Sequence, residues 1–348
     1  MPHESSTISS FETSRTKAIE VQGLTKVYGA LRAVDDIRFT VDRGEIFGFL
    51  GPNGAGKTTT IKMLITISSA TAGRISVFDV DAHREPLKVR QMLGYVPQEV
   101  SVDGYLTAYE NLLIYSKLYF IPKRERQRRI REALEYMDLS DRANELVNHF
   151  SGGMMRRLEI AQVLVNRPKI LFLDEPTIGL DPQAKRAVWN YVKRLNKEFG
   201  TTVFMTTHDM TEADVLCNRL AIINRGRIVV TGEPEKLKHS VGFDTISLRI
   251  STENLPNLES LKSSGITYSG ESNGQLNLSA ENGEKAVPIV LDELRRNNAK
   301  VESVSVSKPT LDDVFLKYAG VRMSSEEQTA QQYIQTRQAR RSFRRLSQ

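Results

Sequence analysis

The sequence has a single cysteine, Cys217, among its 348 residues, which excludes an internal disulfide bond. No run approaches the ~18 consecutive apolar residues that a membrane-spanning helix needs. The start of the chain, Met1 to Lys17, is rich in serine and threonine and lacks the apolar core of a signal peptide. We therefore expect a cytoplasmic protein, and any membrane role must depend on a partner.

Metal-ligand clusters of the zinc type are also absent from the sequence. The five histidines are His3, His83, His149, His208 and His239. They show neither the mutual spacing of ligands nor a neighbouring group of cysteines. We expect no structural zinc.

Most of the excess positive charge lies at the C-terminal end of the chain. The formal net charge is +6, but the last 21 residues hold five arginines and no acidic residue, so the rest of the chain has a net charge of +1. A nearly neutral body excludes a nucleic-acid footprint spread over it, so no nucleic-acid partner is expected. For this basic tail, residues 321–348, we favour disorder over contact with anionic lipid headgroups, and we expect residues 1–17 to be disordered as well. The tail arginines are Arg337, Arg340, Arg341, Arg344 and Arg345.

What is present has the pattern of an α/β fold. Residues 18–50 alternate apolar and polar positions between glycines, which predicts an N-terminal antiparallel β region. Ile46–Leu50 is almost wholly apolar and precedes a glycine-rich loop, as in a strand buried on both faces, and a helix should begin near Lys57. From about residue 99 to 166 the apolar spacing is helical, which predicts a helical insertion.

The remainder divides into the end of this domain and a smaller one. Apolar runs at 170–173, 202–205 and 220–223 alternate with helical segments, which predicts a mainly parallel sheet ending a domain of residues 18–238. Residues 239–320 are typical of a small ferredoxin-like α+β domain, with two strands joined across Asn273-Gly274.

The loop after Leu50 fits the phosphate-binding P-loop pattern in full. Its predicted nucleotide-binding residues are Gly51, Pro52, Asn53, Gly54, Ala55, Gly56, Lys57, Thr58 and Thr59. Glycines let successive backbone N–H groups close around the β-phosphate of ATP, and a helix N-terminus adds positive potential. Lys57 should reach the β- and γ-oxygens, and the Thr58 hydroxyl should bind Mg²⁺.

Two adjacent carboxylates, Asp174 and Glu175, end the apolar run Leu171–Leu173. This arrangement is that of a Walker B segment. We expect Asp174 to orient Mg²⁺ through water and Glu175 to polarise the attacking water as a general base.

The segment Phe150-Ser151-Gly152-Gly153-Met154 resembles the signature sequence of ABC-type ATPases, although Phe150 and Met154 depart from its commonest form, Leu-Ser-Gly-Gly-Gln. The resemblance extends over residues 18–238. It implies that Ser151, Gly152 and Gly153 contact the phosphates of a nucleotide held by a second subunit, so that two copies, most simply a homodimer, sandwich two ATP molecules.

Other short motifs of the family occur in order. By resemblance, Tyr28 stacks on adenine and Val34 lies beside the base. Gln98 matches the glutamine that contacts Mg²⁺ or the attacking water and responds to the membrane partner, Asp181 matches the acid of the loop that pairs across the dimer, and His208 matches the histidine that touches the γ-phosphate.

The family resemblance implies the partners and the location. An integral-membrane permease on a separate chain should dock near Gln98, which places this chain at the cytoplasmic face of the membrane as a peripheral subunit. The segment from Pro309 to Phe315 resembles the tail of daunorubicin-resistance-type exporter subunits, although it is also typical of an N-cap followed by an amphipathic helix. We therefore expect export of a drug, an antibiotic or a lipid-like molecule.

Two other classes of function remain as alternatives. A soluble ABC ATPase of translation or nucleic-acid maintenance usually has two ATPase units, a long coiled coil or cysteine clusters, none of which occurs in this sequence. A nucleotide-binding regulator without turnover is disfavoured by the presence of both Glu175 and His208.

Overall fold

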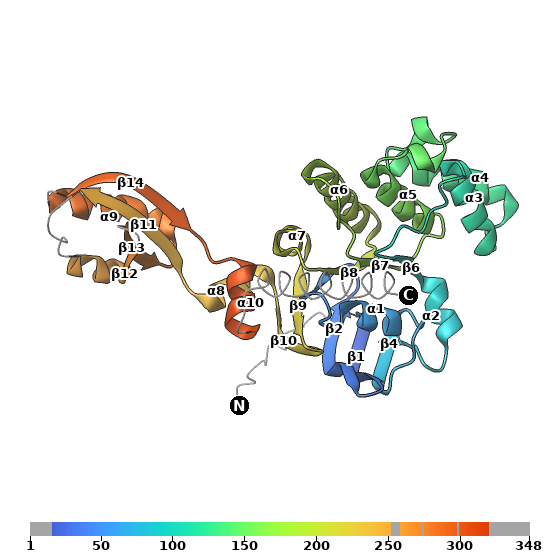
Figure 1. Cartoon of the computed structure of the whole chain (residues 1–348), viewed down its shortest axis with the longest axis horizontal. Coiled ribbons are helices and arrows are strands. Elements are labelled where there is room, and N and C mark those ends of the chain that lie inside the picture. The colour runs from blue at the N-terminus through green and yellow to red at the C-terminus, as the bar shows by residue number, and fades with distance from the viewer. Residues whose placement is uncertain (1–15, 252–257, 273–274, 298, 320–348) are drawn as a thin grey trace, which may run out of the picture. The chain divides into compact units, whose positions relative to one another are not determined.

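The computed structural model of the protein describes residues 16–251, 258–272, 275–297 and 299–319 (Figure 1). The chain forms two compact units, Met1–Val230 and Thr231–Gln348. Of the N-terminal segment 1–17 predicted to be disordered, residues 1–15 lie outside the described residues, and Lys17 was predicted wrongly, because it begins the first β-strand. The basic tail and the Asn273-Gly274 turn also lie outside the described residues. Within the described ranges, no helix is long and apolar enough to cross a membrane.

Two sheets build the first unit, as the strand patterns predicted. One is antiparallel, with the strand order β2-β1-β4-β5, and the other has the order β10-β9-β3-β8-β7-β6, in which β9, β3, β8, β7 and β6 run parallel. The first sheet comprises β1 (Lys17–Tyr28), β2 (Leu31–Asp42), β4 (Ala72–Val77) and β5 (Val80–Asp81). The second comprises β3 (Ile46–Leu50), β6 (Leu93–Val96), β7 (Ile170–Asp174), β8 (Thr202–Thr207), β9 (Arg219–Asn224) and β10 (Arg227–Gly232).

Aromatic side chains fill the space between these sheets. Phe39 of β2 lies 5.7 Å from Phe47 of β3 and 5.9 Å from Phe204 of β8, measured between ring centroids. Each fully buried phenylalanine contributes about 1.5–3 kcal/mol by removal from water. Helix α1 (Lys57–Leu64) begins at the predicted residue and packs against β2 and β7, so the P-loop is fixed between two buried sheets.

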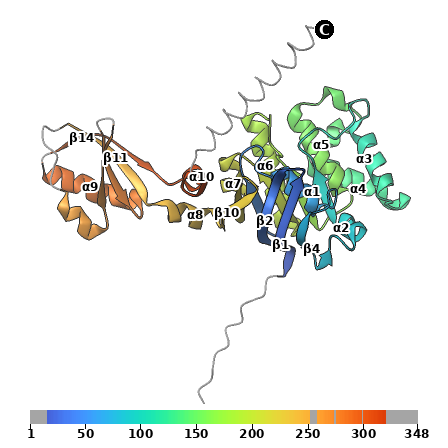
Figure 2. The same cartoon turned by 60° about the horizontal axis from the view of Figure 1, so that its bottom comes forward.

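The predicted helical insertion is present. Figures 1 and 2 both show α3, α4 and α5 gathered together, away from the antiparallel sheet. Helix α3 begins with a capping box, in which Thr107 and Glu110 exchange side-chain and backbone hydrogen bonds. The helices of the unit after α1 are α2 (Pro86–Met92), α3 (Ala108–Leu118), α4 (Lys123–Tyr136), α5 (Gly152–Leu164), α6 (Pro182–Phe199) and α7 (Met210–Leu216), with short 3₁₀ turns at Ser140–Arg142 and Val147–His149.

The second unit has an antiparallel sheet of strand order β12-β13-β11-β14. This is the ferredoxin-like order predicted from the sequence, except that the first helix is only a 3₁₀ turn, which ends at Gly265 with φ 72°. Side chains of α9 pack on the sheet, with Val290 and Leu294 in one core with Leu248. The elements are α8 (Pro234–Val241), β11 (Asp244–Ser251), η3 (Glu259–Ser264), β12 (Thr267–Ser272), β13 (Gln275–Ala280), α9 (Gly283–Arg296), β14 (Lys300–Ser307) and α10 (Leu311–Ala319).

Local folding accounts for the segment that resembles the exporter tail. Thr310 and Asp313 form a reciprocal pair of side-chain and backbone hydrogen bonds at the start of α10, and Val314 and Phe315 are fully buried. Helix α10 packs against α8. This packing explains why the compact units divide at Val230, within the span that the sequence assigned to the first domain.

Candidate active site

The P-loop runs between β3 and α1 with its backbone close to neighbouring strands. A Cβ added at Gly51 would lie 2.3 Å from the carbonyl oxygen of Ile223, and one at Gly56 would lie 2.6 Å from that of Ala33. Gly56 also has φ 110°, which L-residues rarely adopt. No side chain fits at either glycine, so the loop presents bare backbone, as a phosphate cradle requires.

Lys57 extends back over this loop. Its buried Nζ donates to the carbonyl oxygens of Gly51, at 2.6 Å, and Pro52, at 3.3 Å. The same ammonium lies 2.9 Å from Oε1 of Glu175. The P-loop and the end of β7 are therefore joined by a charged contact at the predicted position of the terminal phosphates.

Asp174 is the residue that best fits a metal. Its Oδ1 accepts hydrogen bonds from Thr206, at 2.6 Å, and Thr58, at 3.3 Å. Its Oδ2 is buried and accepts no hydrogen bond from the described residues. Burial raises the pKa of Asp174, and the charge of Glu175 adds to this effect, against the hydrogen bonds from both hydroxyls. A bare carboxylate oxygen beside a threonine hydroxyl suits the hard, oxygen-preferring Mg²⁺ ion.

Glu175 is held from three sides. Its backbone has φ 52°, a left-handed conformation that costs about 1–3 kcal/mol in a non-glycine residue, and its N–H donates to the carbonyl and hydroxyl oxygens of Thr206. Its Oε2 is hydrogen-bonded to Nδ1 of His208. Burial would raise the pKa of Glu175, but the bonds from His208 and Lys57 lower it overall, so the carboxyl group remains ionised and able to accept a proton.

The signature segment begins α5. The Ser151 hydroxyl caps that helix by accepting from the N–H of Met154 at 3.3 Å. A Cβ at Gly153 would lie 2.8 Å from the Cβ of Ala184, so close packing against α6 also restricts this position to glycine. Asp181 caps α6 by accepting from two backbone N–H groups at 2.9 Å.

The residues predicted to contact the base differ in exposure. Tyr28 is 48% exposed at the end of β1, with the ammonium of Lys26 4.9 Å from its ring centroid. Val34 is fully buried in the core, and its side chain lies 3.4 Å from where a Cβ of Gly56 would stand. In this structure the Val34 side chain packs against the P-loop at Gly56 and has no exposed surface that the adenine base could contact.

Sequence reasoning missed several residues that position this site. Thr206 joins Asp174 to the backbone of Glu175, as described above. The buried carboxylate of Glu212 accepts from the hydroxyl of Thr177, at 2.9 Å, and from the indole N–H of Trp189, at 2.9 Å. No local pattern marks these side chains, because their partners lie 23 to 35 residues away in the sequence.

Comparisons with known proteins identify the family to which the chain belongs. The family description "ABC transporter" matches residues 34–178, and "ATP-binding protein DrrA1-3-like, C-terminal domain" matches residues 232–319. The linearmycin resistance ATP-binding protein LnrL of Bacillus subtilis (strain 168) is 37% identical over 307 residues, which cover 87% of this chain and 98% of that protein. The daunorubicin/doxorubicin resistance ATP-binding protein DrrA of Streptomyces peucetius is 39% identical over 311 residues, covering 88% and 94%.

A solved structure shares the fold of the first unit. It is a dimeric ATP-binding cassette in a post-hydrolysis state, bound to ADP and Pi, with a TM-score of 0.56 and 28% identity. The match covers 62% of this chain and 98% of that one.

Fold and site together define a P-loop ATPase. The chain belongs to the ATP-binding subunits of ABC transporters, and its second unit is a C-terminal domain of the DrrA type. The predictions of ATP and Mg²⁺ as ligands, of ATP hydrolysis and of a subunit that powers an exporter are confirmed. The soluble alternative in translation or nucleic-acid maintenance is not favoured.

Proposed function

We propose that this subunit binds ATP on the loop Gly51–Thr58 and hydrolyses it with Glu175 as the general base. The observation that carries this proposal is the position of the Glu175 carboxylate, held between Lys57 and His208. Exposed Tyr28 stacks on adenine, and Thr59 and Gln98 complete the predicted nucleotide contacts.

Each side chain has a separate task in this mechanism. Backbone N–H groups at the start of α1 and the Lys57 ammonium hold the phosphate oxygens, and Thr58 and Asp174 hold the metal, with Gln98 beside it. Mg²⁺, when bound with ATP, neutralises charge on the β- and γ-oxygens. Ionised Glu175 accepts a proton from the attacking water, and His208 keeps the carboxylate oriented through its Nδ1.

The test of this site uses Lys57→Ala. We expect loss of ATPase activity and weaker binding of ATP, because the ammonium would no longer neutralise the phosphates. Normal binding and hydrolysis by Lys57→Ala would refute the proposed site as a whole.

ATP-binding cassettes dimerise, and we propose that this one forms a homodimer that closes over two nucleotides. Ser151, Gly152 and Gly153 would contact the ATP of the second copy, with Asp181 at the dimer contact. The position of Ser151 at the N-terminus of a 13-residue helix favours binding of a phosphate there. In a Glu175→Gln background, light scattering should show an ATP-dependent dimer that Ser151→Arg abolishes while leaving ATP bound to the monomer. A dimer that resists Ser151→Arg would contradict this arrangement.

Transporters of this family work with membrane partners, and we propose that the partner here is a permease on a separate chain. The insertion that follows Gln98 exposes large apolar side chains, including Val100, Tyr105 and Phe120, the last two 89% exposed. Exposed apolar groups of this size favour docking of the permease on the insertion.

Docking on the permease would make the chain a peripheral subunit at the cytoplasmic face of the membrane. Isolation of tagged Glu175→Gln protein from gently solubilised membranes should recover a stoichiometric multi-span protein, and ribosomes, nucleic acid or nothing in its place would contradict the proposal.

The names of relatives suggest the class of molecule that is transported. Both relatives described above are named for resistance, one to linearmycin and the other to daunorubicin and doxorubicin. We infer that this subunit powers export of a drug, an antibiotic or a lipid-like molecule. Cells that lack it should accumulate such a compound and become more sensitive to it, and unchanged accumulation across a panel of amphiphilic compounds would argue against drug export.

Contact of the tail arginines with anionic lipid remains a proposal about residues that the structure does not describe. It predicts that the full chain binds anionic vesicles more tightly than a chain that ends at residue 327. Equal binding would exclude it.

A further inference from the structure

Two buried side chains of α5 form hydrogen bonds with the segment that contains Gln98. The guanidinium of Arg156 donates from Nη1 to the carbonyl oxygen of Pro97, at 2.7 Å, and from Nη2 to that of Gln98, at 3.0 Å. Oε1 of Glu159 accepts from the backbone N–H and the hydroxyl of Ser101, at 2.5 Å and 2.9 Å. We call Arg156 and Glu159 the α5 clamp.

The two members of the clamp are also joined to each other. Nη1 of Arg156 lies 2.9 Å from Oε2 of Glu159, and the side chains are only 6% and 1% exposed. This contact is an ion pair, because Oε2 of Glu159 accepts no hydrogen bond from the described residues. The hydrogen bonds from Arg156 to the two carbonyl groups are charge-assisted, and such bonds in a buried setting are short and directional, so they resist displacement. The clamp therefore holds the Pro97–Ser101 segment firmly against one face of α5.

The helix that carries the clamp is the one that Ser151 begins. Rising 1.5 Å per residue, α5 places Arg156 roughly 7.5 Å along its axis from the cap. A helix transmits displacement along its length as a rigid element, so movement of the clamped segment also moves Ser151. Arg156 grips backbone carbonyl groups, which leaves the Gln98 side chain outside the clamp.

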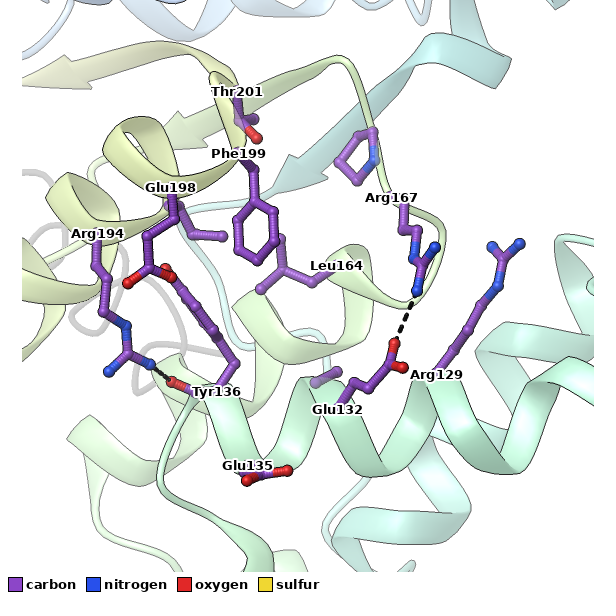
Figure 3. A pocket seen from close by; sticks show the side chains of 13 residues that line it. Arg129, Glu132, Glu135, Tyr136, Leu164, Arg167, Arg194, Glu198, Phe199 and Thr201 are labelled. Carbon is purple, nitrogen blue, oxygen red and sulfur yellow. Dashed lines mark hydrogen bonds and ion pairs between the residues drawn. The ribbon is translucent and has the colours of Figure 1, made fainter.

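Away from the clamp, the insertion meets α6 around a cavity. A cavity of about 820 Å³ lies between α4 and the C-terminal end of α6 (Figure 3). Phe199 and Leu164 line it, and at one side of it Arg194 donates to the backbone oxygen of Tyr136. On this side α4 contacts α6 through Arg194 and through the rings of Tyr136 and Phe199, whose centroids lie 5.4 Å apart.

We infer that Arg156 and Glu159 are positioning residues that make the Gln98 segment and the signature at Ser151 move as one body. A change at Gln98, whether from the metal and nucleotide or from the permease, would then be transmitted to the residues that cover the second subunit's ATP. This inference rests on the proposed function, which places Gln98 and Ser151 at the nucleotides of two different subunits.

The test compares substitutions in the clamp with a neighbour on the same helix. Arg156→Lys keeps the charge but cannot bind two carbonyl groups with one planar fork, and Glu159→Gln keeps an acceptor for Ser101 without the ion pair. The matched control is Arg157→Lys, because Arg157 also donates to a backbone carbonyl, that of Met137 at 3.0 Å, and to the hydroxyl of Tyr191 in α6 at 3.4 Å, and so joins α5 to parts of the chain other than the Gln98 segment.

Three measurements on the purified full-length subunit decide the result. Each clamp variant should bind a fluorescent ATP analogue within about twofold of the parent and have kcat lowered by about tenfold or more, because misplacement by ~1 Å can slow a reaction that much. In the parent, ATP with Mg²⁺ should slow hydrogen exchange in residues 97–101 and 152–159 together. In the clamp variants only the first segment should respond, and Arg157→Lys should behave as the parent does.

The inference fails if a folded clamp variant keeps the parent's kcat, if both segments still respond together, or if Arg157→Lys loses as much activity. Should Arg156→Lys not fold, Glu159→Gln decides the question. Failure of the proposed function would be seen instead in the parent, as absence of ATP binding, and is thereby distinguished from failure of the clamp.

Discussion

Nζ of Lys57 and Oε1 of Glu175 lie 2.9 Å apart, although both side chains are only 5% exposed. The P-loop cation and the predicted base are thus in contact inside the protein. Replacement of Glu175 by Gln keeps an oxygen for this contact but removes the group that accepts a proton. We expect Glu175→Gln to lower kcat by about 10²- to 10⁴-fold with little change in the affinity for ATP. If this variant hydrolyses ATP as fast as the parent, Glu175 is not the base.

Thr206 should control the metal site. Its hydroxyl is hydrogen-bonded to Asp174 at 2.6 Å and to the backbone N–H of Glu175 at 3.1 Å. We expect Thr206→Val, which has the same shape, to raise the Mg²⁺ concentration needed for half-maximal ATPase activity and to lower kcat, because the carboxylate of Asp174 and the backbone N–H of Glu175 each lose an orienting bond. Thr206→Ser, which keeps the hydroxyl, should restore most of the activity. Equal activity of the Val and Ser variants would show that the hydroxyl has no such role.

Glu212 should make stability depend on pH. Burial raises the pKa of this carboxyl group above the value of about 4.3 expected in the unfolded chain, against the hydrogen bonds that lower it. The folded state then holds the proton more tightly than the unfolded state, so the stabilising contribution is complete below the unfolded pKa and is lost as the pH rises through the folded pKa.

Urea unfolding of the parent and of Glu212→Gln over a pH series measures this effect. Gln keeps an acceptor for Thr177 and Trp189 without a charge to bury. The stability of Glu212→Gln relative to the parent should therefore increase as the pH rises from about 4 and then level off, by about 1.4 kcal/mol for each unit of pKa shift. A difference that does not change with pH would contradict the expectation.

Gly48 should be intolerant of a side chain. A Cβ there would lie 2.6 Å from Sγ of Cys217 and 2.9 Å from Cδ1 of Leu50. We expect Gly48→Ala to destabilise the protein by about 1–3 kcal/mol through overpacking. Burial raises the pKa of the Cys217 thiol, so a thiol reagent should label the native parent slowly and Gly48→Ala faster. Labelling of both proteins at the same slow rate, with equal urea midpoints, would show that the strand accommodates the methyl group.

The sequence predicted the features whose signals are local. The P-loop, the strand that ends in Asp174 and the capped start at Ser151 each depend on neighbours within a few residues. The order of elements in the second unit was also predictable, because short alternating strands and turn residues mark it. The first helix of this unit was predicted as a helix, and the structure has a 3₁₀ turn there, at Glu259–Ser264.

The positioning residues could not be predicted, since they depend on contacts made by the folded chain. Arg156 meets Gln98 across 58 residues of sequence, and Thr206 meets Asp174 across 32. Any arginine on an amphipathic helix has the same local pattern as Arg156. Similarly, the burial of Val34 depends on packing between β2 and the P-loop, which spacing along one strand does not reveal.

Trp189 is the only tryptophan in the chain, and its indole N–H donates to Glu212, the carboxylate that also binds Thr177. Thr177 follows Glu175 by two residues, and Glu212 follows His208 by four. Intrinsic tryptophan fluorescence therefore originates from one indole, which Glu212 links to the segments that carry the two proposed catalytic residues, Glu175 and His208. We expect this fluorescence to respond to ATP binding and hydrolysis, so that the proposed closure and reopening can be followed without an attached dye.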